Sequence, residues 1–263
     1  MEQSTFIKRL VARSEFGPLV LLVIMVLVFW QINPAFLSAR NIGNMLAFTV
    51  ELGLIALAMT LLMTAGEFDL SVGSLFGFCP VLMWTLYNTE VTSIEVGFAL
   101  ALAAAVAVGL VSGLFVTRLK IPSFLVTLGM LLVVRGTALF VTSGFPQRTW
   151  NASDLALAEI LVGSFKIAGL RLHMSLLWFV VVAAALGYVL TQTRIGNWIQ
   201  AAGGNPDAAR ARGVDVDSTK IKLFVLSAVM AGFAGVISSI RTAAANPNSG
   251  TGYELEVIAM VVI

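Results

Sequence analysis

Charged side chains inside long apolar stretches are the first candidates for chemistry in this sequence. Glu51 lies in an apolar segment that runs from residue 42 to 64, and Arg135 lies in another from 121 to 142. Ionisable residues at membrane depth are costly, and they usually face a bundle interior or water. Glu51 is therefore a candidate for a pathway or gating residue. An ion pair between helices, conceivably with Arg135, is the equally open alternative, and for Arg135 itself we expect a structural role.

Asp69 and Ser71 form a second candidate site, at the start of the next apolar stretch. An Asp directly before a helix accepts hydrogen bonds from backbone N–H groups that have no partner within the helix. The sequence favours this capping role for Asp69. The alternative is a place near a pathway where the helix begins, and that alternative includes Ser71.

The inventory of reactive side chains argues against an enzyme. The sequence contains one cysteine, Cys79, and one histidine, His173. A single cysteine excludes an intramolecular disulfide and a multi-cysteine metal site, and a single histidine argues against a histidine-based metal centre. The sequence also lacks a visible nucleophile-with-base constellation. We therefore predict no catalytic residue, no metal ligand and no cofactor.

A polar run between two apolar stretches predicts a short helix of about two turns. Asn205 suits the N-cap and Pro206 the first helical position. Asp207 complements the positive end of the helix dipole and Arg210 the negative end, while Gly213 can end the helix in a left-handed conformation. Such a helix is either a connector on the inner face of a membrane or a docking element for a cytoplasmic protein. The candidate docking residues are Gly204, Asn205, Pro206, Asp207, Ala208, Ala209, Arg210, Arg212 and Gly213.

Composition indicates the solvent that these elements face. Hydrophobic residues make up 59% of the 263 residues, and charged residues make up 11%. Soluble domains contain about 25% charged residues, so most of this chain is expected to face lipid. The net charge of +2 is too small and too dispersed for a nucleic-acid surface, and we expect no nucleic-acid partner.

Stretches free of charge predict the positions of membrane spans, each of which needs about 20 predominantly apolar residues. We expect an all-α fold, a polytopic transmembrane helix bundle that forms a single transmembrane domain over residues 1–263. It has about seven spans plus the start of an eighth. The predicted spans are residues 16–39, 42–64, 70–89, 96–117, 121–142, 172–193 and 223–240, with a further segment from 255 to 263.

Lys and Arg in the loops predict the orientation, because cytoplasmic loops carry an excess of both. The larger share falls in residues 1–15, near 118–120 and in the loop 194–222. We therefore expect the N-terminus in the cytoplasm and an outer loop at about 143–172. The mildly apolar residues 155–170 of that loop predict a short surface helix or a re-entrant piece.

Three motifs together resemble one family, the membrane-spanning permease subunits of bacterial ABC importers of the ribose and xylose type. Residues 64–74, T-A-G-E-F-D-L-S-V-G-S, are similar to the family's G-G-I-D-L-S-V-G-S segment. Residues 202–214 form the second motif. Residues 231–235, followed by Arg241 and by 252–259, G-Y-E-L-E-V-I-A, form the third. With the order of spans, the resemblance covers nearly the whole chain.

The resemblance implies a half-transporter in the cell inner membrane that moves a sugar by alternating access and makes no bonds itself. Its partners would be two cytoplasmic ABC ATPase subunits, a second permease copy or paralogue, and an extracytoplasmic solute-binding protein. The helix at 205–213 would be the coupling helix that docks on the ATPase. Glu51 would hydrogen-bond a sugar hydroxyl, and the outer loop with Trp150, Asp154 and Glu159 would meet the binding protein.

Two departures from the family pattern qualify this expectation. Glu67-Phe68 replaces the usual Gly-Ile before Asp69, which indicates either a different substrate or a harmless surface change. Family members also continue beyond the segment that ends here at Ile263, so we expect a C-terminally truncated member. The rival classes are an ion-gradient-driven secondary carrier or channel and a membrane-embedded enzyme. A carrier typically holds several carboxylates at membrane depth, whereas only Glu51 is clearly at depth in this sequence.

Overall fold

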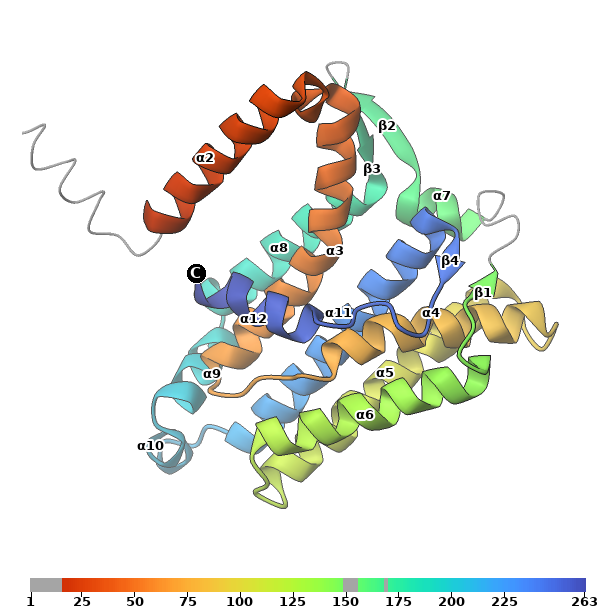
Figure 1. The fold of residues 1–263 in the computed structure, drawn as a ribbon. Coiled ribbons are helices and arrows are strands. Elements are labelled where there is room, and N and C mark those ends of the chain that lie inside the picture. Colours follow the sequence, from red (N-terminus) through yellow and green to blue (C-terminus); the bar gives the residue numbers. More distant parts are fainter. Residues whose placement is uncertain (1–15, 149–155, 168–169) are drawn as a thin grey trace, which may run out of the picture.

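The fold is a bundle of helices with two small pairs of strands (Figure 1). The computed structural model describes residues 16–148, 156–167 and 170–263. The long helices overlap the predicted spans, although the helix Val216–Thr242 extends beyond the predicted residues 223–240 at both ends. The helices are α2 (Phe16–Ile32), η1 (Pro34–Leu37), α3 (Ala39–Thr64), α4 (Val72–Asn88), α5 (Ile94–Thr117), α6 (Ser123–Thr142), α7 (Ala156–Val162), α8 (Met174–Gln192), α9 (Arg194–Gly204), α10 (Pro206–Ala211), α11 (Val216–Thr242) and α12 (Tyr253–Val262).

Among the described residues, five helices are long and apolar enough to cross a membrane, namely α3, α5, α6, α8 and α11. Helices α2 and α4 have 17 residues each, which is near the lower limit of about 17 residues for a span. The predicted fold class, an all-α membrane helix bundle, is therefore confirmed. The count of seven spans stays a prediction.

Helix α11 lies at the centre of the bundle and packs against α3, α4 and α5. Small residues at these contacts allow the helices to approach closely. A Cβ atom added at Gly235 of α11 would meet the backbone carbonyl of Phe76 in α4. A Cβ atom added at Gly109 of α5 would lie 2.7 Å from the Cα atom of Val225 in α11. These contacts leave no room for a larger side chain, so the backbones themselves touch.

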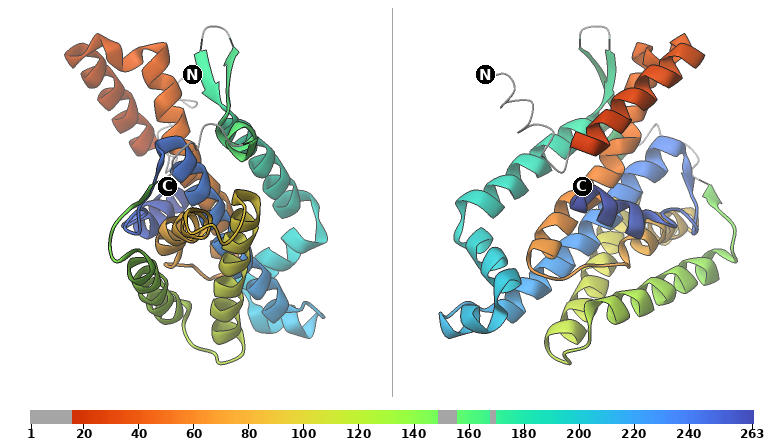
Figure 2. Two further views of the ribbon diagram at one scale, coloured as in Figure 1. Left: turned by 90° about the vertical axis from the view of Figure 1, so that its right-hand side faces the viewer. Right: turned by 60° about the vertical axis from the view of Figure 1, so that its left-hand side comes forward.

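Helix α2 stands away from the bundle and joins it through η1, which it contacts directly (Figure 2). Every residue of α2 is at least partly exposed, including Trp30 at 45% and Ile32 at 73%. Asn33 caps η1 by accepting a hydrogen bond from the backbone N–H of Ala35. The chain therefore turns sharply between α2 and α3, and the predicted first span of residues 16–39 is a shorter helix followed by this turn.

The connection between α6 and α8 contains a β-hairpin that the sequence did not predict. Strand β2 (Ser164–Ile167) pairs antiparallel with β3 (Leu170–His173). Helix α7 precedes it and has seven residues, so the predicted helix over 155–170 is shorter than expected. Another pair joins β1 (Gln147–Arg148) to β4 (Ala244–Ala245).

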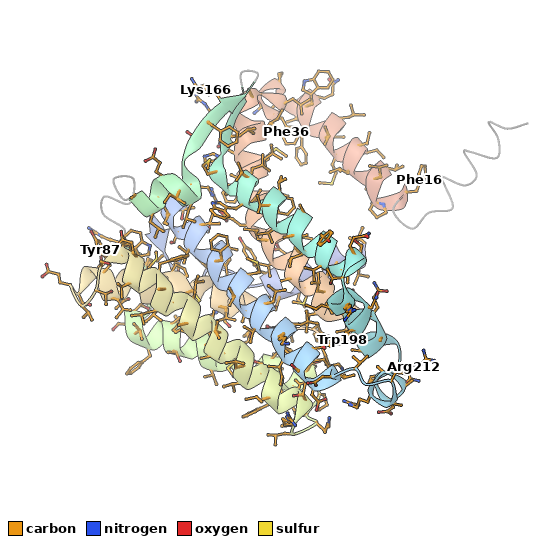
Figure 3. The ribbon with its side chains drawn as sticks, turned by 180° about the vertical axis from the view of Figure 1, so that it is seen from behind. Phe16, Phe36, Tyr87, Lys166, Trp198 and Arg212 are labelled. Carbon is orange, nitrogen blue, oxygen red and sulfur yellow. The ribbon has the colours of Figure 1, made fainter. Side chains whose placement is uncertain are left out.

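Different helix ends, turns and strands lie at the two ends of the bundle. The α10 end contains the α3–α4 junction, the turn between α5 and α6, and α9 with α10; ion pairs such as Lys220–Glu67 and Lys120–Asp217 join them. The β1 end contains the β1–β4 pair and the end of α4, where Asn88 donates a hydrogen bond to the carbonyl of Arg148. Tyr87 and Arg212 mark these opposite ends in Figure 3.

Candidate functional site

Helix α10 is a short helix with both ends fixed, as the sequence predicts. The Asn205 side chain accepts a hydrogen bond from the backbone N–H of Ala208 at 3.0 Å, and Pro206 stands in the first turn. The helix ends where Gly213 adopts a left-handed φ of 84°. Asp207 lies in the first turn and Arg210 in the last, so both charges complement the helix dipole.

A small apolar cluster joins α9, α10 and the start of α11 into one unit, which we call the α10 corner (residues 201–217). Ala202, Ala209 and Val216 are buried together, with Ala201 and Val214 packed beside them. Ala209 is 5% exposed, so it faces this cluster rather than a partner protein. Ala209 is one of the candidate docking residues, and in the structure its side chain is covered by this cluster. The exposed residues of this helix are Asp207, Ala208, Arg210 and Ala211, and Arg212 directly after it is exposed as well.

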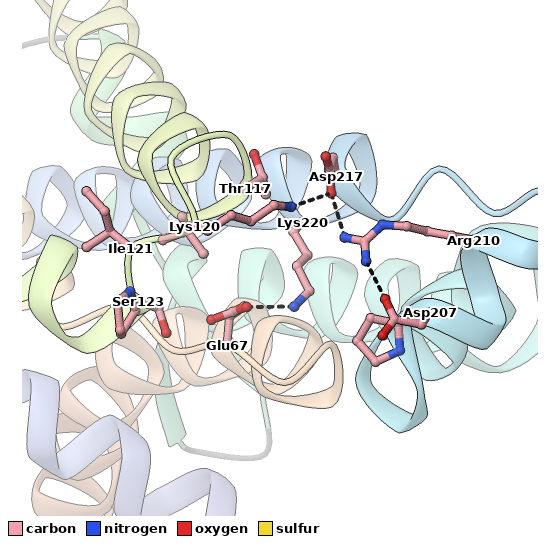
Figure 4. A pocket seen from close by; sticks show the side chains of 12 residues that line it. Glu67, Thr117, Lys120, Ile121, Ser123, Asp207, Arg210, Asp217 and Lys220 are labelled. Carbon is pink, nitrogen blue, oxygen red and sulfur yellow. Dashed lines mark hydrogen bonds and ion pairs between the residues drawn. The ribbon is translucent and has the colours of Figure 1, made fainter.

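Ion pairs tie the α10 corner internally and to its neighbours (Figure 4). Arg210 contacts Asp217 at 2.9 Å and Asp207 at 3.2 Å. The hydrogen bond with Asp217 is the main reason that the pKa of Arg210 is raised above its usual value. Lys120, from the turn between α5 and α6, lies 3.8 Å from the same carboxylate.

A cavity of about 450 Å³ lies between the α10 corner, the α5–α6 turn and the α3–α4 junction (Figure 4). Charges of both signs line it. Glu67, Asp207 and Asp217 face Lys120, Arg210 and Lys220 across or along its walls. The cavity is therefore a charged recess beside α10 that changes shape if the corner moves relative to the bundle.

Asp69 and Ser71 lie buried at the α3–α4 junction. Asp69 is fully buried, and its Oδ1 atom accepts hydrogen bonds from the backbone N–H of Ser71 at 2.8 Å and from the Ser71 hydroxyl at 2.6 Å. Ser227 of α11 also faces this carboxylate. Asp69 therefore bonds within the turn before α4, whose N-cap is Ser71 and has no side-chain capping hydrogen bond, so the helix-capping bond favoured for Asp69 is not seen at the start of α4. The arrangement holds the start of α4 to the centre of the bundle.

Glu51 pairs with Arg241 rather than with Arg135. The Nε atom of Arg241 donates to a Glu51 carboxylate oxygen at 2.7 Å, and the side chains are 13% and 2% exposed. The Arg241 guanidinium also lies over the ring of Phe48, 4.0 Å from its centroid, which is a cation–π geometry. The conceivable ion pair between Glu51 and Arg135 is therefore wrong, because Arg135 donates its hydrogen bonds to backbone carbonyls elsewhere in the chain. Arg241 was noted in the sequence only as part of a motif, and its partner lies 190 residues away.

Arg135 holds the segment between β4 and α12 against α4. Its guanidinium donates to the carbonyls of Pro247 at 2.6 Å, Ser249 at 2.8 Å and Gly73 at 3.0 Å. Gly73 and Gly77 of α4 leave room for this segment, since a Cβ atom at Gly77 would lie 2.8 Å from the carbonyl oxygen of Ser249. The structural role expected for Arg135 matches this geometry.

The other candidates differ in where they lie. Cys79 is buried and packs, and His173 stands at the start of α8. Within the described ranges, no group of three or more His, Cys, Asp or Glu side chains that could hold a metal is found. Trp150 and Asp154 lie outside the described residues, while Glu159 lies in the first turn of α7.

Comparison with known proteins identifies the family. The sequence profile of the family described as "Branched-chain amino acid transport system / permease component" matches residues 41–263. The ribose import permease protein RbsC of Escherichia coli K12 is 34% identical over 95% of this chain and 76% of its own length. The xylose/arabinose import permease protein XylH of Sulfolobus acidocaldarius is 33% identical over 98% of this chain and 71% of its own length. The L-arabinose ABC transporter permease protein AraH of Azospirillum brasilense is 36% identical over 88% and 66%.

A search of solved structures gives no match. The resemblance that the three motifs predict is confirmed by the family profile and by these relatives. The chain belongs to the family of branched-chain amino acid transport system / permease components, within which its named relatives are permeases of ABC sugar importers.

Proposed function

We propose that this chain is the membrane-spanning permease subunit of an ATP-driven ABC importer. The solute is a sugar of the ribose, xylose or arabinose kind, moved into the cytoplasm by alternating access, and the chain performs no bond-making chemistry. The observation that carries the proposal is the similarity to RbsC, 34% identity over 95% of this chain. Two ATPase subunits, a second permease copy or paralogue, and an extracytoplasmic binding protein complete the complex.

The α10 corner is the docking element for the ATPase in this proposal. A helix of six residues is marginal in water by itself, but the Asn205 cap, the Arg210 ion pairs and the small apolar cluster hold it. Asp207 points outward with its side chain 96% exposed. A rigid and polar projection of this kind can transmit a displacement without melting.

The distribution of charge supports a cytoplasmic position for the α10 end under the same proposal. Cytoplasmic segments carry an excess of Lys and Arg, and acidic residues contribute little to orientation. The basic residues of the α10 end are Arg118, Lys120, Arg194, Arg210, Arg212, Lys220 and Lys222. The N-terminus then also lies in the cytoplasm, because α2 and α3 bring the chain to this end at Thr64.

Glu51, Asp69 and Ser71 are proposed as residues of the pathway or its gate. Glu51 and Arg241 place a carboxylate and a guanidinium beside an aromatic ring between apolar helices. Such a set offers hydrogen-bond acceptors and donors to sugar hydroxyls together with an apolar face. Asp69 and Ser71 would act by positioning the start of α4.

Uptake into proteoliposomes tests this function. The complex is purified through a tag on the full-length permease and is reconstituted with its binding protein. Labelled ribose, xylose and arabinose serve as probes. We expect uptake only when ATP reaches the ATPase subunits, and none when their Walker A lysine, which contacts the nucleotide phosphates, is replaced. Uptake that survives this replacement, or that needs only an ion gradient, contradicts the proposal and favours a secondary carrier.

A further inference from the structure

The α10 corner touches the α3–α4 junction at one place where backbones meet without an intervening side chain. A Cβ atom added at Gly203 would overlap the carbonyl oxygen of Thr64, the last residue of α3. A Cβ atom at Gly66 would in turn lie 3.6 Å from the Cα atom of Gly203. The neighbouring Gly204 has open space around its Cβ position. Only the first glycine of this pair is therefore required by the contact.

An ion pair ties the α3–α4 junction to α11, the helix whose first residues belong to the α10 corner. The Nζ atom of Lys220 in α11 lies 2.6 Å from a carboxylate oxygen of Glu67, and both side chains are largely buried, at 13% and 14% exposure. Glu67 follows Gly66 directly, so both ties reach the short stretch from Thr64 to Glu67. Figure 4 shows the ion pair between Glu67 and Lys220. The stretch is thus held from two sides by elements that pack with α10.

The stretch that receives these ties leads directly to buried Asp69. Beyond the end of α3 at Thr64, Gly66 lies in the left-handed region at a φ of 82°, and the N–H of Glu67 donates to the carbonyl of Leu62. Asp69 then bonds to Ser71, at the start of α4. Because protein interiors are close-packed, a displacement of this stretch is passed on to its neighbours rather than absorbed. Movement of the α10 corner therefore reaches the first turn of α4 over a few residues.

We propose that Gly203 is a positioning residue that couples α10 to the bundle. Its backbone contact with Thr64 carries the displacement of the α10 corner to the α3–α4 junction. The Glu67–Lys220 ion pair holds this junction in a fixed position relative to α11. This inference rests on the proposed function, because it concerns the transfer of motion from an ATPase to the pathway. It adds a specific point of contact, which neither the docking role of α10 nor the pathway role of Asp69 implies.

Paired glycine substitutions test the contact in the complete complex. Gly203→Ala and Gly204→Ala raise helix propensity equally, and only the former places a methyl group against a backbone carbonyl. We expect Gly203→Ala to retain the ATPase subunits and to hydrolyse ATP, while the sugar taken up per ATP hydrolysed falls by about tenfold, which is the effect of overpacking one site. Gly204→Ala is expected to match the wild type.

The ratio of uptake to hydrolysis separates coupling from mere stability, because partial unfolding lowers both rates together. Equal ratios for the two alanine variants overturn the inference. If Gly203→Ala does not assemble, charge reversal decides instead. Glu67→Lys and Lys220→Glu are each expected to lower the ratio, and the double variant to restore it. A double variant that remains as uncoupled as the single ones overturns the inference. Failure of the wild-type complex to use ATP contradicts the proposed function itself, which is a distinct result.

Discussion

The Glu51–Arg241 pair gives the sharpest test of how this bundle is held together. We consider the single replacements Glu51→Leu and Arg241→Met, and the double variant that carries both. At a separation of 2.7 Å and an effective dielectric constant of about 20, two unit charges attract by about 6 kcal/mol. The desolvation of both groups opposes this attraction, so the pair itself contributes little net stability.

The single variants are expected to be far less stable than the double variant. Each leaves one buried charge without its partner, which lowers the free energy of unfolding by about 3–5 kcal/mol. The double variant replaces both charges with apolar side chains of similar length and is expected to lie within about 1–2 kcal/mol of the wild type. The exposed Asp207–Arg210 pair is the matched control, since Asp207→Ala removes a surface ion pair and is expected to change stability by about 1 kcal/mol or less.

These differences in the free energy of unfolding are measured in mixed micelles, where unfolding is induced by titration with a denaturing detergent. Single variants whose free energy of unfolding stays within about 1 kcal/mol of the wild type refute the reasoning, because a buried charge without a partner is expected to destabilise the fold by more than that. Sugar uptake by the stable double variant then separates the two roles of Glu51. A structural pair predicts retained uptake, and a pathway residue predicts its loss.

Three further substitutions extend the account to other contacts. Gly235→Ala is expected to lower the midpoint of thermal unfolding in detergent, because its methyl group meets a carbonyl of α4, whereas Gly136→Ala on the open face of α6 is expected to leave the midpoint unchanged. Arg135→Lys is expected to expose the segment 246–252 to limited proteolysis, since an ammonium cannot span the three carbonyls that the guanidinium reaches. Ala209→Asp is expected to weaken co-purification of the ATPase by disrupting the small cluster of the α10 corner, with membrane insertion unchanged. An unchanged midpoint for Gly235→Ala, unaltered cleavage for Arg135→Lys or full recovery of the ATPase with Ala209→Asp would each contradict the corresponding contact.

Local features of the sequence predict local structure well in this chain. Asn205-Pro206 and Gly213 predict both ends of α10, because capping depends on residues within a few positions of each other. Charge-free stretches likewise predict where the long helices lie. The β2–β3 hairpin was missed, although Lys166 and Arg171 interrupt apolar residues with the alternation typical of strands.

Long-range pairs are the part that the sequence could not predict. The sequence analysis offered Arg135 as a conceivable partner of Glu51, whereas the crossing of α3 with the end of α11 brings Arg241 to it. Ala209 looked available for docking because the sequence of α10 alone does not show which face the next helix covers. Glu67 looked like an isolated departure from a motif until Lys220, 153 residues away, was placed beside it. In each case the deciding information is tertiary packing, which no local pattern contains.

Cross-linking from α10 tests the central claim, that this chain docks an ATPase at its α10 end. The only cysteine in the sequence, Cys79, is fully buried, so a thiol reagent reaches an introduced surface cysteine of this chain and not Cys79. Asp207→Cys is placed on the exposed face of α10, and Ala244→Cys on the exposed side of the β1 end. In membranes that contain the whole complex, a short photo-activated cross-linker attached to the introduced thiol is expected to join the permease to the ATPase from position 207 and not from position 244. A cross-link from position 244, or none from position 207 in a complex that hydrolyses ATP, would contradict the claim.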